Sequence, residues 1–119
     1  EKRETLDKIA DVHPYAKMLY TATLAVIVCG DLSDESGKLY WQQNCSAAIE
    51  NLMLACKAKD LGSVWLGVAP REERMNEIIK LFNLPEHIKP LGIVAVGYPD
   101  GEVTMPDRFE PNKIHYEAY

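Results

Sequence analysis

One stretch, Tyr40–Val68, decides the fold of this chain: YWQQNCSAAIENLMLACKAKDLGSVWLGV. Its apolar residues recur at the i, i+3, i+4 and i+7 positions, which predicts one long buried helix over about residues 39–61. Gly62 would supply the left-handed residue that ends many helices. The apolar run Val64–Val68 then predicts a short strand, so a tryptophan and a glycine arrive together at the end of one element.

Helices and strands alternate on both sides of this stretch. A helical pattern over residues 1–12 precedes an apolar strand at 24–29, and a helix beginning at Pro70 precedes a strand at 90–98. This alternation favours a layered α/β or α+β domain. The segment 100–119 has too few core residues to pack on itself, so we expect an arm that lies across another surface.

Composition limits the possible functions. The 119 residues are 47% hydrophobic and 26% charged, which is typical of one soluble domain or part of one. The net charge of -5 comes without a block of Lys and Arg, which argues against nucleic acid or an anionic membrane as a partner. No apolar run approaches the roughly 20 residues that span a bilayer. The chain opens at Glu1 with charged residues, so we expect no signal peptide and either a fragment or residues ahead of it.

The cysteines predict a reducing compartment. Cys29, Cys45 and Cys56 are an odd number with no CxxC pair. Cys45 and Cys56 would lie about 16 Å apart along the helix, too far for a disulfide. We therefore expect reduced, buried cysteines in a cytoplasmic protein, and no metal site.

Hydrolytic chemistry has little support in the sequence. There is no GxSxG, HExxH or P-loop motif. His13 ends a helix beside a proline, His87 lies in a predicted turn and His115 lies in the tail, so each is interpreted as a surface or capping residue. If the protein is an enzyme, a cofactor would carry the chemistry and no side chain is expected to be catalytic.

Gly67 is the best candidate for a ligand contact. It follows Trp65 and Leu66 directly, and a missing side chain lets the main chain approach a planar ligand and donate to a ring nitrogen. Trp65 taken alone is more often a core residue than the wall of a cofactor site. Arg108 lies among acidic tail residues, where a solvated ion pair competes with a bidentate phosphate contact.

Several segments together resemble the nitroreductase family of FMN-dependent flavoproteins. CSAAIENLMLA (45–55) and LGSVWLG (61–67) are similar to the family's central helix and following strand. IKPLGIVAVGYP (88–99) is similar to its next strand, residues 2–31 to its helix and apolar strand, and residues 107–116 to its C-terminal arm. These segments occur in the family's order, and they cover nearly the whole chain.

The resemblance implies an α+β three-layer sandwich, with a central mixed sheet flanked by helices, in an obligate homodimer that binds FMN at its interface. Residues 1–119 would be the C-terminal two-thirds of the domain, with 100–119 as the arm, and the family's N-terminal FMN-binding segment has no counterpart in this sequence. Carried over, Trp65, Leu66 and Gly67 would line the flavin ring and Arg108 would reach its phosphate.

The implied activity is electron transfer from NAD(P)H through FMN to a nitroaromatic, a quinone or a related small acceptor. Two alternatives stay open. One is a truncated, flavin-free dimerisation scaffold or fragment of such an enzyme. The other is a relative with different flavin chemistry, such as dehalogenation or flavin fragmentation.

Overall fold

The computed structural model describes residues 1–101 and 104–119. The chain forms a three-stranded sheet with three α-helices and two 3-10 turns. In chain order these elements are α1 (Arg3–Val12), η1 (Lys17–Tyr20), β1 (Leu24–Asp31), α2 (Glu35–Lys57), β2 (Gly62–Gly67), α3 (Glu72–Phe82), β3 (Ile88–Gly97) and η2 (Pro111–Lys113). The three predicted strands are therefore confirmed, each within a few residues of its expected position.

The sheet has the strand order β1-β3-β2, and both pairings are antiparallel. In the described residues the expectation of a mixed sheet is thus wrong. β3 is central because it is the most continuously apolar strand, with an unbroken run of buried residues from Pro90 to Val96. Its two neighbours, β1 and β2, never pair with each other within this sheet.

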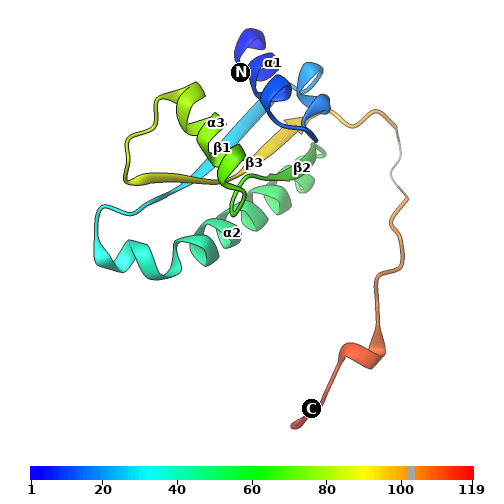
Figure 1. The fold of residues 1–119 in the computed structure, drawn as a ribbon. Coiled ribbons are helices and arrows are strands. Elements are labelled where there is room, and N and C mark those ends of the chain that lie inside the picture. The colour runs from blue at the N-terminus through cyan, green and yellow to red at the C-terminus, as the bar shows by residue number, and fades with distance from the viewer. Residues whose placement is uncertain (102–103) are drawn as a thin grey trace.

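Helices cover both faces of the sheet, which gives three layers and confirms the α+β sandwich (Figure 1). Ile93 and Ala95 of β3 pack in one apolar cluster with α1, η1 and α3. Val94 and Val96 pack in a second cluster against α2. This split follows from the strand's two-residue side-chain period, which sends neighbouring residues to opposite faces.

The predicted apolar face of the first helix is confirmed. Leu6, Ile9 and Ala10 are buried, and His13 follows them on the same face as the residue that caps α1. The exposed side carries an i,i+4 ion pair between Lys8 and Glu4, as expected for a helix lying on a sheet.

The long helix begins and ends earlier than the periodicity predicts. Asp34 caps it by accepting a hydrogen bond from the Gly37 N–H at 2.7 Å, so the first turn lies ahead of the start predicted at about residue 39. A kink follows at Tyr40, where the backbone leaves helical geometry (φ -120°, ψ 17°). Beyond it, Trp41 packs against Gly30 of β1, where any Cβ would come within 2.8 Å of the indole.

The prediction that Gly62 ends this helix is wrong. Asp60 takes the left-handed conformation, with φ 55°, and Gly62 instead begins β2. The N–H of Leu61 bonds the carbonyl of Cys56 at 2.9 Å, and the N–H of Asp60 bonds that of Lys57 at 3.1 Å. Both bonds belong to a Schellman motif, in which aspartate stands where glycine is usual. Similarly, α3 begins at Glu72 rather than at Pro70.

The C-terminal segment leads away from the sheet and helices (Figure 1). Every residue from 104 to 119 is exposed, and η2 is its one regular turn. The part of the expected arm at 102–103 lies outside the described residues. Among the helices of the described chain, none combines the length and apolar character needed to cross a lipid bilayer.

Candidate functional site at the end of strand β2

Trp65, Leu66 and Gly67 close β2, but they do not all face the same way. Successive side chains of a strand point to opposite faces, so Trp65 and Gly67 share the face on which α2 lies. Leu66 is 3% exposed and belongs to the apolar cluster of the α1 and α3 layer. Only the main chain of Leu66 can therefore meet a ligand on the α2 side.

The main chain of Gly67 faces away from the sheet. In residues 1–101 and 104–119, β2 pairs with β3 on one side and has no strand on the other. Val68 N–H donates to the Leu91 carbonyl at 3.1 Å, and inward-facing positions alternate along an antiparallel pair. The N–H and C=O groups of Trp65 and Gly67 consequently point outward from this open edge.

A pocket of about 240 Å³ lies beside these residues. Its lining comes from α2, the end of β2, the turn after it and β3: Gln42, Ser46, Trp65, Gly67, Ala69, Pro70 and Leu91. No charged side chain lines it, so the polar groups available to a ligand are an amide, a hydroxyl, the indole N–H and main chain.

The Trp65 indole lies over β3, where Gly92 makes room for it. A Cβ on Gly92 would come within 2.3 Å of the indole Nε1 and 3.2 Å of Ile49. Gly92 lies inside β3, and this contact with the indole is its structural reason. With 37% of its surface exposed, the Trp65 side chain is partly packed against the sheet and partly open to solvent.

Gly67 has the most open Cβ position of the strand glycines, since Gly62 and Gly97 would make ordinary contacts from 3.5 Å upward. A Cβ built there meets no atom within 4 Å, whereas Gly30 and Gly92 would collide with indole rings. The backbone of Gly67 is also outside the left-handed region that favours glycine. Packing and conformation within this chain would thus accept any small residue at this position.

Two side chains that the sequence did not single out reach the Gly67 carbonyl. His13 Nε2 lies 3.0 Å from it and Arg74 Nη1 donates to it at 2.9 Å. His13 is a capping residue as expected, yet it is 2% exposed rather than on the surface. The position of His13 on the apolar face of α1 was the sequence signal that could have predicted its burial. No comparable signal in the sequence pointed to Arg74.

Comparisons with known proteins agree with this architecture. The sequence profile described as "Nitroreductase family" matches residues 1–98. The chain belongs to the nitroreductase family. A protein of Methanothermobacter thermautotrophicus, named "Putative NADH dehydrogenase/NAD(P)H nitroreductase", is 44% identical over 117 residues, which are 98% of this chain and 61% of that protein.

Two crystal structures of nitroreductase-like proteins superpose closely. One, from Bacteroides thetaiotaomicron, carries the same name; it has 42% identity and a TM-score of 0.92, and the match covers 99% of this chain and 68% of that one. The other, a "Putative NADH Oxidase" from Clostridium acetobutylicum, has 41% identity and a TM-score of 0.94, covering 100% and 72%. This chain therefore spans about two-thirds of the length of these relatives.

Arg108, the fourth predicted site residue of this nitroreductase-family chain, is not brought to the β2 site. It lies on the exposed C-terminal segment, which Figure 1 shows leading away from the sheet. The hollow around Arg108 is lined by its own neighbours, residues 104–109, and by nothing from the α2 or β2 layers. The described chain therefore does not bring Arg108 and Trp65 into one site.

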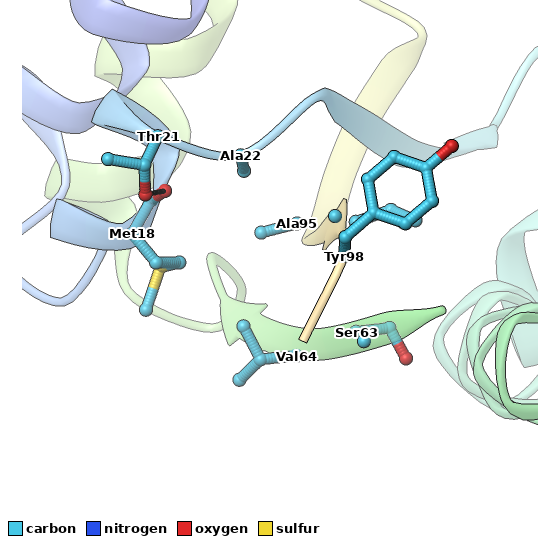
Figure 2. A pocket seen from close by; sticks show the side chains of 10 residues that line it. Met18, Thr21, Ala22, Ser63, Val64, Ala95 and Tyr98 are labelled. Atoms are coloured by element: carbon cyan, nitrogen blue, oxygen red, sulfur yellow. Dashed lines mark hydrogen bonds between the residues drawn. The ribbon is translucent and has the colours of Figure 1, made fainter. Parts of the chain in front are cut away.

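A second pocket, of about 230 Å³, lies at the opposite end of β2. Figure 2 shows Met18 and Thr21 on one side of it and the ring of Tyr98 on the other, with Val64 and Ser63 along β2. It contains none of the predicted site residues. Its lining has one titratable side chain, the largely exposed Tyr98, so it offers little for catalysis.

The thiols of the chain are not built for nucleophilic chemistry. All three cysteines are free, and Cys45 and Cys56 are buried. Burial raises the pKa of the Cys29 thiol, with a further contribution from Cys45, and burial also raises the pKa of Cys45. Raised values keep these thiols protonated at neutral pH. In the described residues no three His, Cys, Asp or Glu side chains cluster as metal ligands would.

Proposed function

We propose that this protein is an FMN-dependent oxidoreductase that transfers electrons from NAD(P)H to nitroaromatic, quinone or similar small acceptors. The family to which the chain belongs and the names of its relatives support a reductase that uses a nicotinamide cofactor. The resemblance described above implies FMN. The geometry of the β2 site supports a flat, aromatic ligand at that position.

The observation that carries the proposal is the empty space at Gly67. Among the described residues no contact requires a glycine there, and a Cβ would meet no atom within 4 Å. A glycine that neither packing nor backbone conformation requires is best explained by a ligand or a second chain that approaches the main chain closely at that position. A planar ring lying against the strand end would need that closeness.

The residues around Gly67 fit such a ring. The outward N–H of Gly67 can donate to a ring nitrogen, and the partly exposed indole of Trp65 can cover an aromatic edge. The Gln42 amide and the Ser46 hydroxyl, which share the pocket, can meet polar ring atoms. When bound, FMN would accept hydride from NAD(P)H and deliver electrons to the acceptor, while these residues hold and orient the ring.

The described residues form only part of the walls that a bound ligand would need. Its volume of 240 Å³ lies below the roughly 300–1,000 Å³ of ligand pockets, so further walls must come from outside the described residues. Large apolar side chains of α2, including Leu39 and Leu54, are 70% and 59% exposed. Burying them against a second copy supports a homodimer with FMN at its interface.

The C-terminal segment fits the same proposal. Met105, Phe109 and Tyr116 are 70% or more exposed, which is unfavourable for a segment that stays in water. Laid over a partner subunit, residues 104–119 would bury these side chains and bring Arg108 toward a phosphate. The three free cysteines suit a reducing compartment, so we place the protein in the cytoplasm.

Flavin binding by the purified protein tests the proposal directly. We expect a yellow protein, a dimer by light scattering, one FMN recovered per subunit, and NAD(P)H oxidation that depends on an added nitroaromatic or quinone. A colourless dimer that takes up no added FMN would favour the flavin-free scaffold instead. Bound flavin without turnover of either acceptor would point to a different flavin reaction.

A further inference from the structure

A third pocket, of about 240 Å³, lies between the end of α1 and the start of α3. Val12 and Pro14, at and just beyond the end of α1, line one side of it. Its charged lining comes from the residue before α3 and the first two turns of that helix: Arg71, Glu72, Glu73, Arg74 and Glu77. This cavity, which we call the α3 pocket, therefore offers cations and carboxylates, whereas no charged side chain lines the β2 site.

The α3 pocket shares a wall with the β2 site. Ala69 and Pro70 line the β2 site, and the next residue, Arg71, lines the α3 pocket. Arg74 makes a second connection, because it lines the α3 pocket while its Nη1 donates to the carbonyl of Gly67 at 2.9 Å. A short segment of chain thus separates the two cavities, so a ligand made of two linked halves can place one half in each.

Two carboxylates of the α3 pocket have no cationic partner in the described chain. Glu73 and Glu77 lie one helical turn apart, and like charges at this spacing destabilise a helix. Every ion pair among the residues that the structure describes lies outside α3. Arg74, three residues before Glu77, instead donates to the Gly67 carbonyl and lies 5.3 Å from the centre of the Tyr15 ring. The two carboxylates can therefore accept hydrogen bonds from a ligand in the pocket.

This set of groups suits the adenosine half of a nicotinamide dinucleotide. A carboxylate accepts a hydrogen bond from the ribose 2′-hydroxyl in NAD-binding sites, whereas an arginine accommodates the 2′-phosphate in NADP-binding sites. Three carboxylates line the α3 pocket, and their charge would repel a 2′-phosphate. Of the two arginines, Arg74 is engaged with the Gly67 carbonyl. Arg71 lies between the cavities, where its guanidinium can hold the pyrophosphate that joins the two halves.

We propose that the α3 pocket binds the adenosine ribose of the electron donor through Glu73 and Glu77, and that these carboxylates select NADH over NADPH. Arg71 holds the pyrophosphate of either donor. This inference rests on the proposed function, because it places the nicotinamide ring beside the flavin in the neighbouring β2 site. It adds a second, charged binding site to that function and a preference between the two donors.

The first test compares steady-state oxidation of NADH and NADPH by the holoprotein, with a quinone in excess as the acceptor. The wild type should prefer NADH in kcat/KM. Glu73→Gln and Glu77→Gln should each raise KM for NADH by about three- to tenfold, the loss of one hydrogen bond, with kcat unchanged. KM for NADPH should not rise, so the preference shrinks by that factor. Arg71→Met should raise KM for both donors alike, since both carry the pyrophosphate.

A second test measures the pocket without turnover, by calorimetric titration with ADP-ribose and with 2′-phospho-ADP-ribose. Both probes lack the nicotinamide ring, so neither depends on the flavin. ADP-ribose should bind the wild type more tightly than its 2′-phosphate does, and Glu73→Gln and Glu77→Gln should weaken it by the same factor as KM. Glu86→Gln is the matched control, because it makes the same charge change at an exposed glutamate beyond the other end of α3. It should keep every wild-type value.

The outcomes separate this inference from the proposed function. Equal use of NADH and NADPH by the wild type, or wild-type values in both glutamate variants, would overturn the donor site and leave the flavin reductase intact. Failure of the wild type to bind ADP-ribose would also overturn it. A protein that takes up no FMN would overturn the proposed function instead, and the ADP-ribose titration would still decide whether Glu73 and Glu77 bind the ribose.

Discussion

Replacing Gly67 by alanine should separate folding from flavin binding. The added methyl group meets no atom within 4 Å, and the backbone lies outside the left-handed region, so the fold accepts it. Alanine also restricts the unfolded chain, which should raise the free energy of unfolding by about 0.4–1 kcal/mol. With an unfolding entropy of about 0.25 kcal/mol/K for a domain of this size, the melting temperature should rise by about 2–4 °C.

Flavin binding should change in the opposite direction. A methyl group inserted where a ring lies against the main chain overpacks the contact, at a cost of about 1–3 kcal/mol. The dissociation constant for FMN should therefore increase by about 5- to 150-fold. Few substitutions stabilise a protein and also weaken the binding of its ligand. A higher melting temperature together with a higher dissociation constant for FMN is therefore a demanding test.

Two measurements on the apoprotein are sufficient: thermal unfolding without FMN, and quenching of FMN fluorescence on titration. Ser63→Ala is the control, since Ser63 lies on the same face of β2 but in the other pocket (Figure 2). It should leave FMN affinity unchanged. Wild-type affinity in Gly67→Ala would refute the reason assigned to this glycine, and a lower melting temperature would refute the claim that its side-chain space is open.

Three further results are expected. Asp60→Gly should raise the free energy of unfolding by about 0.5–1 kcal/mol in urea titrations, because glycine suits the φ of 55° at the end of α2. Gly92→Ala should lower it by about 1–3 kcal/mol, because the added Cβ would lie 2.3 Å from the Trp65 Nε1 and must displace the indole. The displacement should be seen as a red-shifted Trp65 emission in a Trp41→Phe background. The Ser36 hydroxyl and the Gly37 N–H lower the pKa of Asp34 below its ordinary value of 3.8, so its cap is complete above that pH and is lost as the pH falls through the lowered pKa. Asp34→Asn should remove this part of the acid dependence, measured by thermal unfolding between about pH 5 and pH 2, and an unchanged pH profile would show that the cap does not depend on the charge.

The strands could be predicted because their signal is local. The runs in β1 and β3 are continuous and rich in β-branched residues, which are common in buried strands. The helix limits were harder, since α2 is capped by Asp34 and closed by Asp60, and neither breaks the apolar period. The antiparallel pairing could not be predicted from the residues, because it depends on how the connections cross the sheet, which no local pattern records; the mixed sheet was an expectation from the family resemblance alone.

The candidate site divides in the same way. Trp65 and Gly67 were found because they are neighbours in sequence and one is an aromatic ring. His13 was missed because its partner Gly67 is 54 residues away, a contact that only the packing of α1 beside the sheet creates. Arg74 was missed because an arginine on an amphipathic helix is usually a solvated residue. The role of Arg108 stays a prediction.

The central position of β3 has a consequence for biosynthesis. β1 and β2 each bond only to β3 in the described sheet, yet β3 is the last of these three strands to leave the ribosome. At about 5–20 residues per second, some 3 to 13 s pass between the emergence of Asp31 and that of Gly97. During that interval the apolar strand β1 has no strand to pair with in the described sheet. Nascent chains stalled before Ile88 should therefore be bound by chaperones and sensitive to proteases, whereas chains stalled after Gly97 should resist both.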